Sequence, residues 1–354
     1  MASIRDIAKM AGVSPASVSR ILNNDPSFSI NKNTRARVIE IANRVQYSKK
    51  NSERGPKSAG KKMTIGLILR HDAKTELSDP YFHEIHEGIE EEAAKWRLHA
   101  EVAFTMHEKN RDWESLSAYG AVIMVGEMTA DAISKIKKYN KNLILIDATP
   151  SDPNLSYICN DFVDKTYEIL NYLYSLGHRN IAYIGGRSSI VDGNGKTIYQ
   201  AGDARANAYH NWMKLKGLGK YEQALITNWS THEGLQSANK LLELDPRPSA
   251  VVVGSDPMAL GVYKAFSNHK INIPQDISIV SFDDVEMTQY LTPTLSSVYI
   301  NANEMGKLGV RLAKSMISEE VNASITVTVH SQLKIRESIA KKKIILFSSC
   351  VNIY

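Results

Sequence analysis

Residues 4–23 read Ile-Arg-Asp-Ile-Ala-Lys-Met-Ala-Gly-Val-Ser-Pro-Ala-Ser-Val-Ser-Arg-Ile-Leu-Asn and predict two short helices joined by a tight turn. Apolar side chains share one face of each helix: Ile7, Ala8 and Ala11 in the first, and Val18, Ile21 and Leu22 in the second. Gly12 ends the first helix, because glycine readily takes the left-handed conformation. Ser14 can cap the second helix, and Pro15 suits its first turn, where a backbone N–H has no helical partner.

A third helix is expected to begin near Asn31 and to brace this pair. Its apolar stripe has helical spacing and consists of Val38, Ile41, Ala42 and Val45. Three such helices over residues 1–47 form a small all-α helix-turn-helix head, whose second helix can enter the major groove of DNA. The residues predicted to contact DNA are Ser14, Pro15, Ala16, Ser17, Ser19, Arg20, Asn23, Thr34 and Arg35.

The side chains and the charge of the head both favour a DNA partner. Arg20 can donate two hydrogen bonds to a guanine edge, Ala16 can contact a thymine methyl, and hydroxyl groups suit phosphates. Residues 1–62 hold 13 lysines and arginines against four acidic residues, a net charge of +9, whereas the whole chain carries +5. A basic head on a mildly acidic body indicates a polyanion partner for the head. The alternative is a solvated helical cap without a DNA role.

The bulk composition narrows the class of protein further. The chain has 354 residues, of which 43% are hydrophobic, and its two cysteines cannot form a disulfide framework. We expect no signal peptide and no membrane partner, because no apolar run approaches the roughly 20 residues of a membrane span. The composition therefore predicts a cytoplasmic protein of two or three folding units.

Short β-branched runs alternate with amphipathic stretches from Thr64 onward. The expected strands are Ile65–Leu69, Ala100–Phe104, Val122–Val125, Leu143–Ile146, Ile181–Ile184, Val251–Val253 and Ile277–Phe282. The expected helices lie near residues 83–97, 131–139, 164–176, 203–216, 233–243, 257–268 and 303–317. Such alternation predicts an α/β body of parallel sheets with helices on both faces. Its length favours two lobes, with a ligand bound in the crevice beyond the carboxyl ends of the strands.

The head and three segments of the body resemble the lac/gal repressor family. The head fits the pattern D-[IV]-A-x-x-A-G-V-S-x-x-T-V-S-R, with Ser17 in place of the commoner threonine, and its continuation resembles galactose-type and evolved β-galactosidase-type repressors. The body segments that resemble the family are Gly177–Gly186, Ser255–Gly261 and Ile273–Asp284. The resemblance implies a two-lobed body like a periplasmic sugar-binding protein, a homodimer on double-stranded operator DNA, and a transcriptional repressor under allosteric control by a small sugar.

The resemblance also implies boundaries within the chain. A basic hinge or linker occupies residues 48–62, and an effector-binding domain occupies residues 63–340. The chain would cross between lobes near residues 158–161, 290 and 322. Lobe 1 would then comprise 63–158 and 291–322, and lobe 2 would comprise 159–290 and 323–340. The 341–354 tail lacks leucine heptads, which favours a dimer over a tetramer.

The linker departs from the pattern of the family. The resemblance implies a hinge helix that inserts a leucine into the minor groove, but Gly55-Pro56 stands where that leucine is expected. Residues 48–62 are basic and almost free of apolar side chains, which is typical of a flexible tether. We therefore expect a tether that follows DNA phosphates, with Pro56 as an alternative apolar wedge.

A sugar site needs polar groups for hydroxyls and a flat apolar face for ring C–H groups, and both types follow the predicted strands. The candidate effector-binding residues are Tyr81, Phe82, Asp147, Asp161, Arg205, Trp229, Ser255, Asp256 and Asp283. The resemblance marks Arg205, Trp229, Ser255 and Asp283 as effector contacts. Trp229 could instead be a core aromatic, Asp147 or Asp161 a helix cap, and Arg205 with Asp283 a structural ion pair.

Two other classes of protein are less well supported. A phosphate-binding loop at Gly195-Lys196-Thr197 would need glycine where Ile190 stands, and neither GxGxxG after the first strand nor GxSxG occurs. The histidines lack metal-ligand spacing, so we expect neither an enzyme nor a cofactor or metal site. A periplasmic sugar carrier would share the body but not the basic head. The effector is predicted to be galactose or a β-galactoside, with a purine or a phosphorylated co-effector as the alternative.

Overall fold

The computed structural model describes residues 4–22, 28, 30–44, 63–70, 79–200 and 202–342. These residues divide into two units, a small head and a large body, with the division placed after Lys57. Asn23, the linker at 48–62 and residues 343–354 of the tail lie outside the described residues, so the predictions made for them stay predictions.

The head is a three-helix unit, as the sequence predicts. It consists of α1 (Ile4–Ala11), α2 (Pro15–Leu22) and α3 (Lys32–Arg44). Gly12 has φ +65°, and the amide of Val13 returns to the carbonyl of Ala8 at 3.1 Å, which closes the turn after α1. The buried core contains Ile7, Ala8, Ala11, Val18, Ile21, Val38, Ile41 and Ala42.

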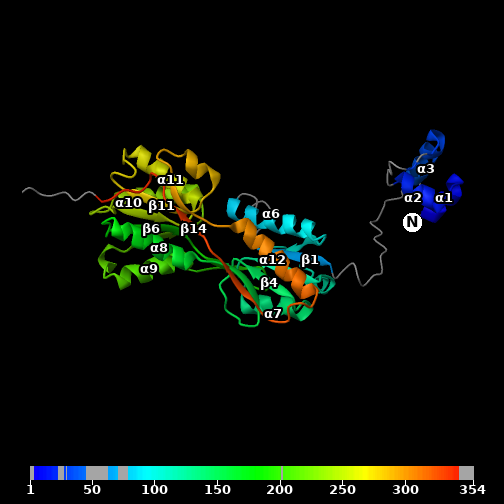
Figure 1. Cartoon of the computed structure of the whole chain (residues 1–354), viewed down its shortest axis with the longest axis horizontal. Coiled ribbons are helices and arrows are strands. Elements are labelled where there is room, and N and C mark those ends of the chain that lie inside the picture. The colour runs from blue at the N-terminus through cyan, green and yellow to red at the C-terminus, as the bar shows by residue number, and fades with distance from the viewer. Residues whose placement is uncertain are drawn as a thin grey trace, which may run out of the picture. The chain divides into compact units, whose positions relative to one another are not determined.

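The body contains two six-stranded sheets, one in each lobe (Figure 1). Lobe 1 has the all-parallel order β13 (Thr326–Val329), β5 (Ser156–Asn160), β4 (Leu143–Ile146), β3 (Ala121–Val125), β1 (Thr64–Leu69) and β2 (His99–Thr105). Lobe 2 has the order β14 (Gln332–Lys334), β12 (Ser296–Tyr299), β11 (Ser278–Asp283), β10 (Ala250–Val253), β6 (Ile181–Gly186) and β9 (Gln223–Thr227). Only β14 runs antiparallel to its neighbour among the described strands of this second sheet.

Helices cover both faces of each sheet (Figure 1). Lobe 1 carries α6 (Pro80–Lys95), α7 (Ala130–Tyr139), α12 (Ala302–Ile317) and the short η1 (Glu114–Ala118). Lobe 2 carries α8 (Phe162–Ser175), α9 (Ala204–Leu215), α10 (Thr231–Leu242), α11 (Asp256–Asn268), η2 (Gly219–Tyr221) and η3 (Glu286–Tyr290). A hairpin of β7 (Ser189–Val191) and β8 (Thr197–Tyr199) lies between β6 and α9 in the chain. The expected strands and helices are all present.

One helix pair in each lobe packs through glycines. A Cβ on Gly306 of α12 would lie 2.1 Å from the carbonyl oxygen of Ile85 in α6. A Cβ on Gly261 of α11 would lie 2.0 Å from the carbonyl oxygen of Thr231 in α10. Only glycine therefore permits the close approach of these helix backbones.

The chain crosses between the lobes three times, and two of these crossings differ from the sequence-based expectation. The first lies between β5 and α8, at residues 160–162, as expected. The second lies at 300–301 and the third at 330–331, because β12 belongs to lobe 2 and β13 to lobe 1. The expected crossings near 290 and 322 are therefore wrong: residues 291–299 belong to lobe 2 and residues 323–329 to lobe 1. The strands β12 and β13 are rich in serine and threonine, so they carry little apolar signal.

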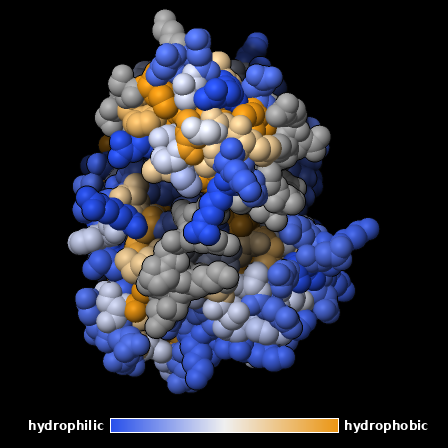
Figure 2. Space-filling view, turned by 90° about the vertical axis from the view of Figure 1, so that its right-hand side faces the viewer, coloured by the Kyte–Doolittle hydropathy of each residue, from blue (hydrophilic) through white to orange (hydrophobic). Residues whose placement is uncertain are grey.

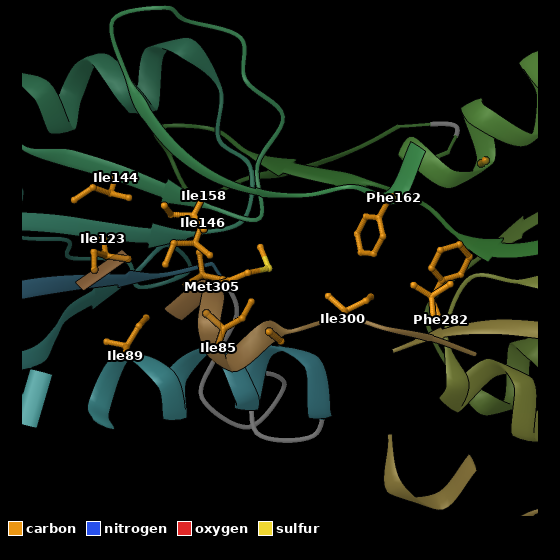
Figure 3. Packing of buried hydrophobic residues seen from close by; sticks show 14 of the residues in the cluster. Ile85, Ile89, Ile123, Ile144, Ile146, Ile158, Phe162, Phe282, Ile300 and Met305 are labelled. Carbon is orange, nitrogen blue, oxygen red and sulfur yellow. The ribbon is translucent and has the colours of Figure 1, made fainter. Parts of the chain in front are cut away.

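Hydrophobic side chains lie mainly inside the lobes. Phe162 and Ile300, which lie at crossings of the chain, sit between the isoleucine-rich core of lobe 1 and Phe282 of lobe 2 (Figure 3). On the face drawn in Figure 2, hydrophilic residues predominate and hydrophobic residues form small groups between them. Among the helices of the described residues, none combines the length and hydrophobicity of a membrane span.

Candidate functional site

The second helix of the head exposes three of the predicted DNA-contacting side chains. Ser14 caps this helix, because its Oγ accepts a hydrogen bond of 3.1 Å from the amide of Ser17. Pro15, Ala16 and Arg20 are exposed, while Ser17, Ser19, Thr34 and Arg35 are half-buried. The Arg20 guanidinium lies 5.4 Å from the centre of the Phe28 ring. None of these residues belongs to the buried core of the head, so their substitution does not remove core packing.

Lobe 1 contributes a hydrogen-bonded group at the carboxyl ends of its strands. Tyr81, in the first turn of α6, donates its hydroxyl to Asp147 Oδ1 at 2.9 Å. Asn160 donates Nδ2 to the same oxygen at 2.7 Å. Asp147 has φ +57°, a left-handed conformation that is uncommon outside glycine and often found at functional positions. Burial raises the pKa of Asp147 to about 6, although the Tyr81 hydroxyl opposes this rise.

Lobe 2 contributes a buried arginine enclosed by aromatic rings. The Arg205 guanidinium carbon lies 4.1 Å from the ring centre of Phe162, 4.6 Å from Trp229 and 5.4 Å from Phe282. Its Nε donates to Asp203 at 2.5 Å, and its Nη1 donates to the carbonyl of Gly254 at 2.8 Å. The ion pair of Arg205 is therefore made with Asp203 and not with Asp283, which was the structural alternative.

Trp229 offers a flat surface beside this arginine. Its Nε1 donates to the carbonyl of Arg187 at 3.0 Å, which fixes the orientation of the indole. A Cβ on Gly186 would lie 2.3 Å from the indole ring, so only glycine lets the ring lie against this strand end. Trp229 remains 37% exposed, which does not fit the alternative of a core aromatic.

Carboxyl groups from both lobes lie within electrostatic range of Arg205. Burial raises the pKa of Asp79 in lobe 1, while its hydrogen bond from the Tyr81 amide and the charge of Arg205 lower it. Burial and the neighbouring Asp256 raise the pKa of Asp283 in lobe 2 well above its usual value, and Arg205 opposes the rise. Carboxyl groups whose pKa is raised by burial in this way are typical of binding sites. We call Asp79, Tyr81, Asp147, Arg205, Trp229 and Asp283 the inter-lobe site.

Three predicted effector contacts make hydrogen bonds within the fold. Both oxygens of Asp161 accept the amide of Ser331, at 3.1 and 3.2 Å, which ties the first crossing of the chain to the third. Ser255 caps α11 by accepting the amide of Met258. Asp256 is 1% exposed, so it cannot face a ligand. Its carboxylate accepts hydrogen bonds from Ser281, Ser297 and the amide of Val285.

The candidates from the sequence did not include Asp79 of the inter-lobe site or three residues beside it. Arg70, directly after β1, lies 5.7 Å from the ring centre of Phe82, which was predicted, and contacts the carbonyl of Ser189 in lobe 2. Asn160 binds Asp147, and Phe162 covers Arg205. Arg70 could have been predicted from the sequence, because it directly follows a predicted strand that ends at the expected crevice. Asn160 and Phe162 carried no such signal, because the strand that ends at Asn160 was not predicted and the helix was expected to begin only near residue 164.

Comparison with known proteins accounts for both parts of the chain. Residues 3–50 match the family model of bacterial regulatory proteins, lacI family, and residues 170–339 match a periplasmic binding protein-like domain. The transcriptional repressor MelR of Bacillus subtilis is 30% identical over 346 residues, which cover 96% of this chain and 97% of MelR. The chain belongs to the lacI family of transcriptional regulators. The regulator GalR of Lacticaseibacillus casei is 28% identical over 340 residues, which cover 96% of this lacI-family chain and 99% of GalR.

Solved structures show the same fold as this lacI-family regulator. The lac repressor dimer bound to operator and the anti-inducer ONPF aligns with a TM-score of 0.68 at 19% identity, over 96% of this chain and 99% of that one. A LacI-family regulator from Silicibacter pomeroyi aligns with a TM-score of 0.69 at 20% identity, over 97% of this chain and 100% of that one. The relatives are DNA-binding transcriptional regulators and not enzymes. The chain is accordingly a DNA-binding regulator with a sugar-binding type of body.

Proposed function

We propose that this regulator is a homodimeric repressor whose affinity for operator DNA is controlled by galactose or a β-galactoside bound at the inter-lobe site. It would act in the cytoplasm, where two heads meet a pseudo-palindromic operator, because a two-fold protein matches two half-sites one helical turn apart. Coupling between the two sites is reciprocal, so operator DNA must change the affinity for the effector by the same factor.

The observation that carries this proposal is the pairing of one flat aromatic surface with polar groups from both lobes. Trp229 can pack against the C–H face of a pyranose ring, while Asp147 and Asp283 can accept hydrogen bonds from hydroxyls and Arg205 can donate them. A ligand that bonds to both lobes stabilises one lobe arrangement over others, which is what allosteric control requires.

Similar proteins whose structures hold sugars support a sugar ligand. The structure of the regulator CelR is a complex with cellobiose, and a LacI-family regulator from Enterococcus faecium holds bound ribose. Two relatives are named GalR and another LacR. The choice of a galactoside also rests on the resemblance of the head to galactose-type repressors.

A thermal-shift screen of the full chain tests the effector class. The probes are galactose, lactose, cellobiose, ribose, glucose 6-phosphate and hypoxanthine, each at millimolar concentration. Galactose or lactose should raise the melting temperature of the body and change operator affinity in a gel-shift assay. A response only to glucose 6-phosphate or hypoxanthine would replace the sugar with a phosphorylated or purine co-effector.

Two tryptophan variants localise the binding. Trp229→Ala should weaken binding of the responding sugar at least tenfold, because packing of the C–H face of the sugar ring against the indole is lost. Trp96→Ala is the matched control, because Trp96 is 42% exposed and lies at the end of α6, away from the inter-lobe site. Equal losses in the two variants would place the effector elsewhere.

A further inference from the structure

The β7–β8 hairpin leaves the sheet of lobe 2 and ends in an ordered tip. Asp192 Oδ1 accepts the amides of Asn194 and Lys196, both at 2.8 Å. The amide of Gly195, which has φ +80°, donates to the carbonyl of Asp192 at 2.9 Å. The tip is therefore held in one conformation by its own hydrogen bonds, and it can present a fixed surface.

The backbone of this hairpin pairs with the backbone of lobe 1. The amide of Thr129 donates to the carbonyl of Val191 at 3.0 Å, and the amide of Val191 donates to the carbonyl of Glu127 at 3.3 Å. Val191 and Met128 form a parallel bridge. Val191 is 1% exposed and packs in the hydrophobic cluster of lobe 1 that lies under α7. A strand of lobe 2 thus adds to lobe 1 through main-chain bonds and an apolar contact.

The tip contacts the first turns of α7. The amide of Gly193 donates to Asp131 Oδ2 at 3.1 Å, and Lys135 Nζ donates to the carbonyl of Gly193 at 3.0 Å. Lys135 also reaches Asn194 Oδ1 at 3.4 Å. The backbone of the tip also lies close to the backbone of lobe 1 at Gly195. A Cβ on Gly195 would lie 2.1 Å from the carbonyl oxygen of Met106 in lobe 1.

The base of the same hairpin is bonded to the surroundings of the inter-lobe site. The carbonyl of Ser189 accepts Nη1 of Arg70 at 2.9 Å, and the carbonyl of Arg187 accepts Nε1 of Trp229 at 3.0 Å. The segment therefore connects the indole of the site at one end with α7 of lobe 1 at the other.

We propose that residues 187–200 are a clasp that holds the two lobes closed over the inter-lobe site, with Asp131 and Lys135 as positioning residues. Because an effector enters between the lobes, the clasp has to open for exchange of the effector, and it would set how fast that exchange occurs. The role in effector exchange rests on the proposed function, whereas the clasp itself concerns the lobes alone.

Hydrogen exchange of the full chain without sugar or DNA tests the clasp. The readout is the exchange of the Thr129 and Val191 amides, which bond across the lobes. Gly195→Ala should speed their exchange at least tenfold, because its Cβ cannot fit beside Met106. Gly217→Ala is the matched control, since Gly217 has φ +67° and open space around its Cβ, so both variants carry the same backbone strain.

A second pair of variants tests the contact with α7. Lys135→Ala should also speed exchange of the two amides at least tenfold, whereas Lys137→Ala, which loses only an ion pair with Asp152 inside lobe 1, should stay within twofold. Spin labels at Glu114→Cys and Leu215→Cys, introduced after the native Cys159 and Cys350 are replaced by alanine, report the distance between lobes in each variant, and Gly195→Ala should broaden that distance distribution.

Equal exchange rates in Gly195→Ala and Gly217→Ala, or an unchanged distance between lobes in Gly195→Ala, would overturn the clasp. Neither measurement contains an effector, so a failed clasp is distinguishable from a failed sugar screen. Cooperative thermal unfolding of every variant confirms that the lobes are folded before exchange is compared.

Discussion

Replacing Asp147 by asparagine should stabilise the body at neutral pH. The left-handed backbone at this residue, φ +57°, accepts asparagine about as well as aspartate. The asparagine Oδ1 can still accept hydrogen bonds from Tyr81 and Asn160, as the aspartate does. The substitution therefore keeps the local geometry and removes only the charge that burial disfavours.

The size and the sign of this effect follow from the raised pKa of Asp147. A rise from 3.8 to about 6 means that ionisation in the folded state costs up to roughly 3 kcal/mol more than in the unfolded chain. Because the pKa of Asp147 is higher in the folded than in the unfolded chain, the protonated carboxyl contributes fully to stability below pH 3.8. This contribution is lost as the pH rises through 6. Because Asp147 is half-buried and solvent screens it, we expect a gain of about 1 to 3 kcal/mol at pH 7.5.

Urea unfolding of the body at pH 4.5 and pH 7.5 measures the difference. The free energy of unfolding of Asp147→Asn should exceed that of the wild type at pH 7.5 and lie close to it at pH 4.5. Asp152→Asn is the control, because hydrogen bonds from Asn154 lower the pKa of this exposed carboxyl, so its removal should not stabilise the body at pH 7.5. A variant that is destabilised equally at both pH values would refute the reasoning, because Asp147 would then contribute through hydrogen bonds alone.

Three further outcomes are expected. Arg20→Ala should weaken binding to operator by about 1–3 kcal/mol while leaving binding to scrambled DNA and the melting temperature nearly unchanged, as anisotropy titrations can show. Gly306→Ala should destabilise the body by about 1–3 kcal/mol in urea, because its Cβ meets the α6 backbone, whereas Gly219→Ala has open space and should cost far less. Arg311→Met should cost about 3–5 kcal/mol at pH 7, because the buried Glu92 carboxylate loses its guanidinium partner at 2.8 Å. Arg311 lowers the pKa of Glu92 to about 2, so the stability it supplies is present above pH 4.5 and is lost as the pH falls through 2, and the deficit of the variant should shrink in acid.

The sequence predicted the head and the framework of the body because both depend on local signals. Caps, glycine stops and helical spacing act within a few residues, and they placed the head core from Ile7 to Ala42. The central parallel strands are continuous apolar runs and were equally clear. Two strands were not: Ser296–Tyr299 and Thr326–Val329 are rich in serine and threonine, and the second pairs with a strand that is distant in sequence.

The candidate site was predicted in part, because residue type and position at a strand end do not fix what a side chain contacts. Arg205, Trp229 and Asp283 do lie at the inter-lobe site. Asp256 was chosen for the same reasons, yet three donors from the fold surround its carboxylate. The β7–β8 hairpin left no clear signal, because each of its strands has three residues and its partner in lobe 1 is distant in the sequence.

The three crossings between the lobes have a consequence for synthesis of the chain. Lobe 1 needs the strand at Thr326–Val329 and lobe 2 needs the strand at Gln332–Lys334, so neither lobe is complete until nearly the whole body has emerged from the ribosome. The head, whose contacts are all local, can fold as soon as its third helix is made. A nascent chain would therefore carry a folded head long before the body that regulates it exists, and a premature stop before residue 326 would release a head attached to two incomplete sheets.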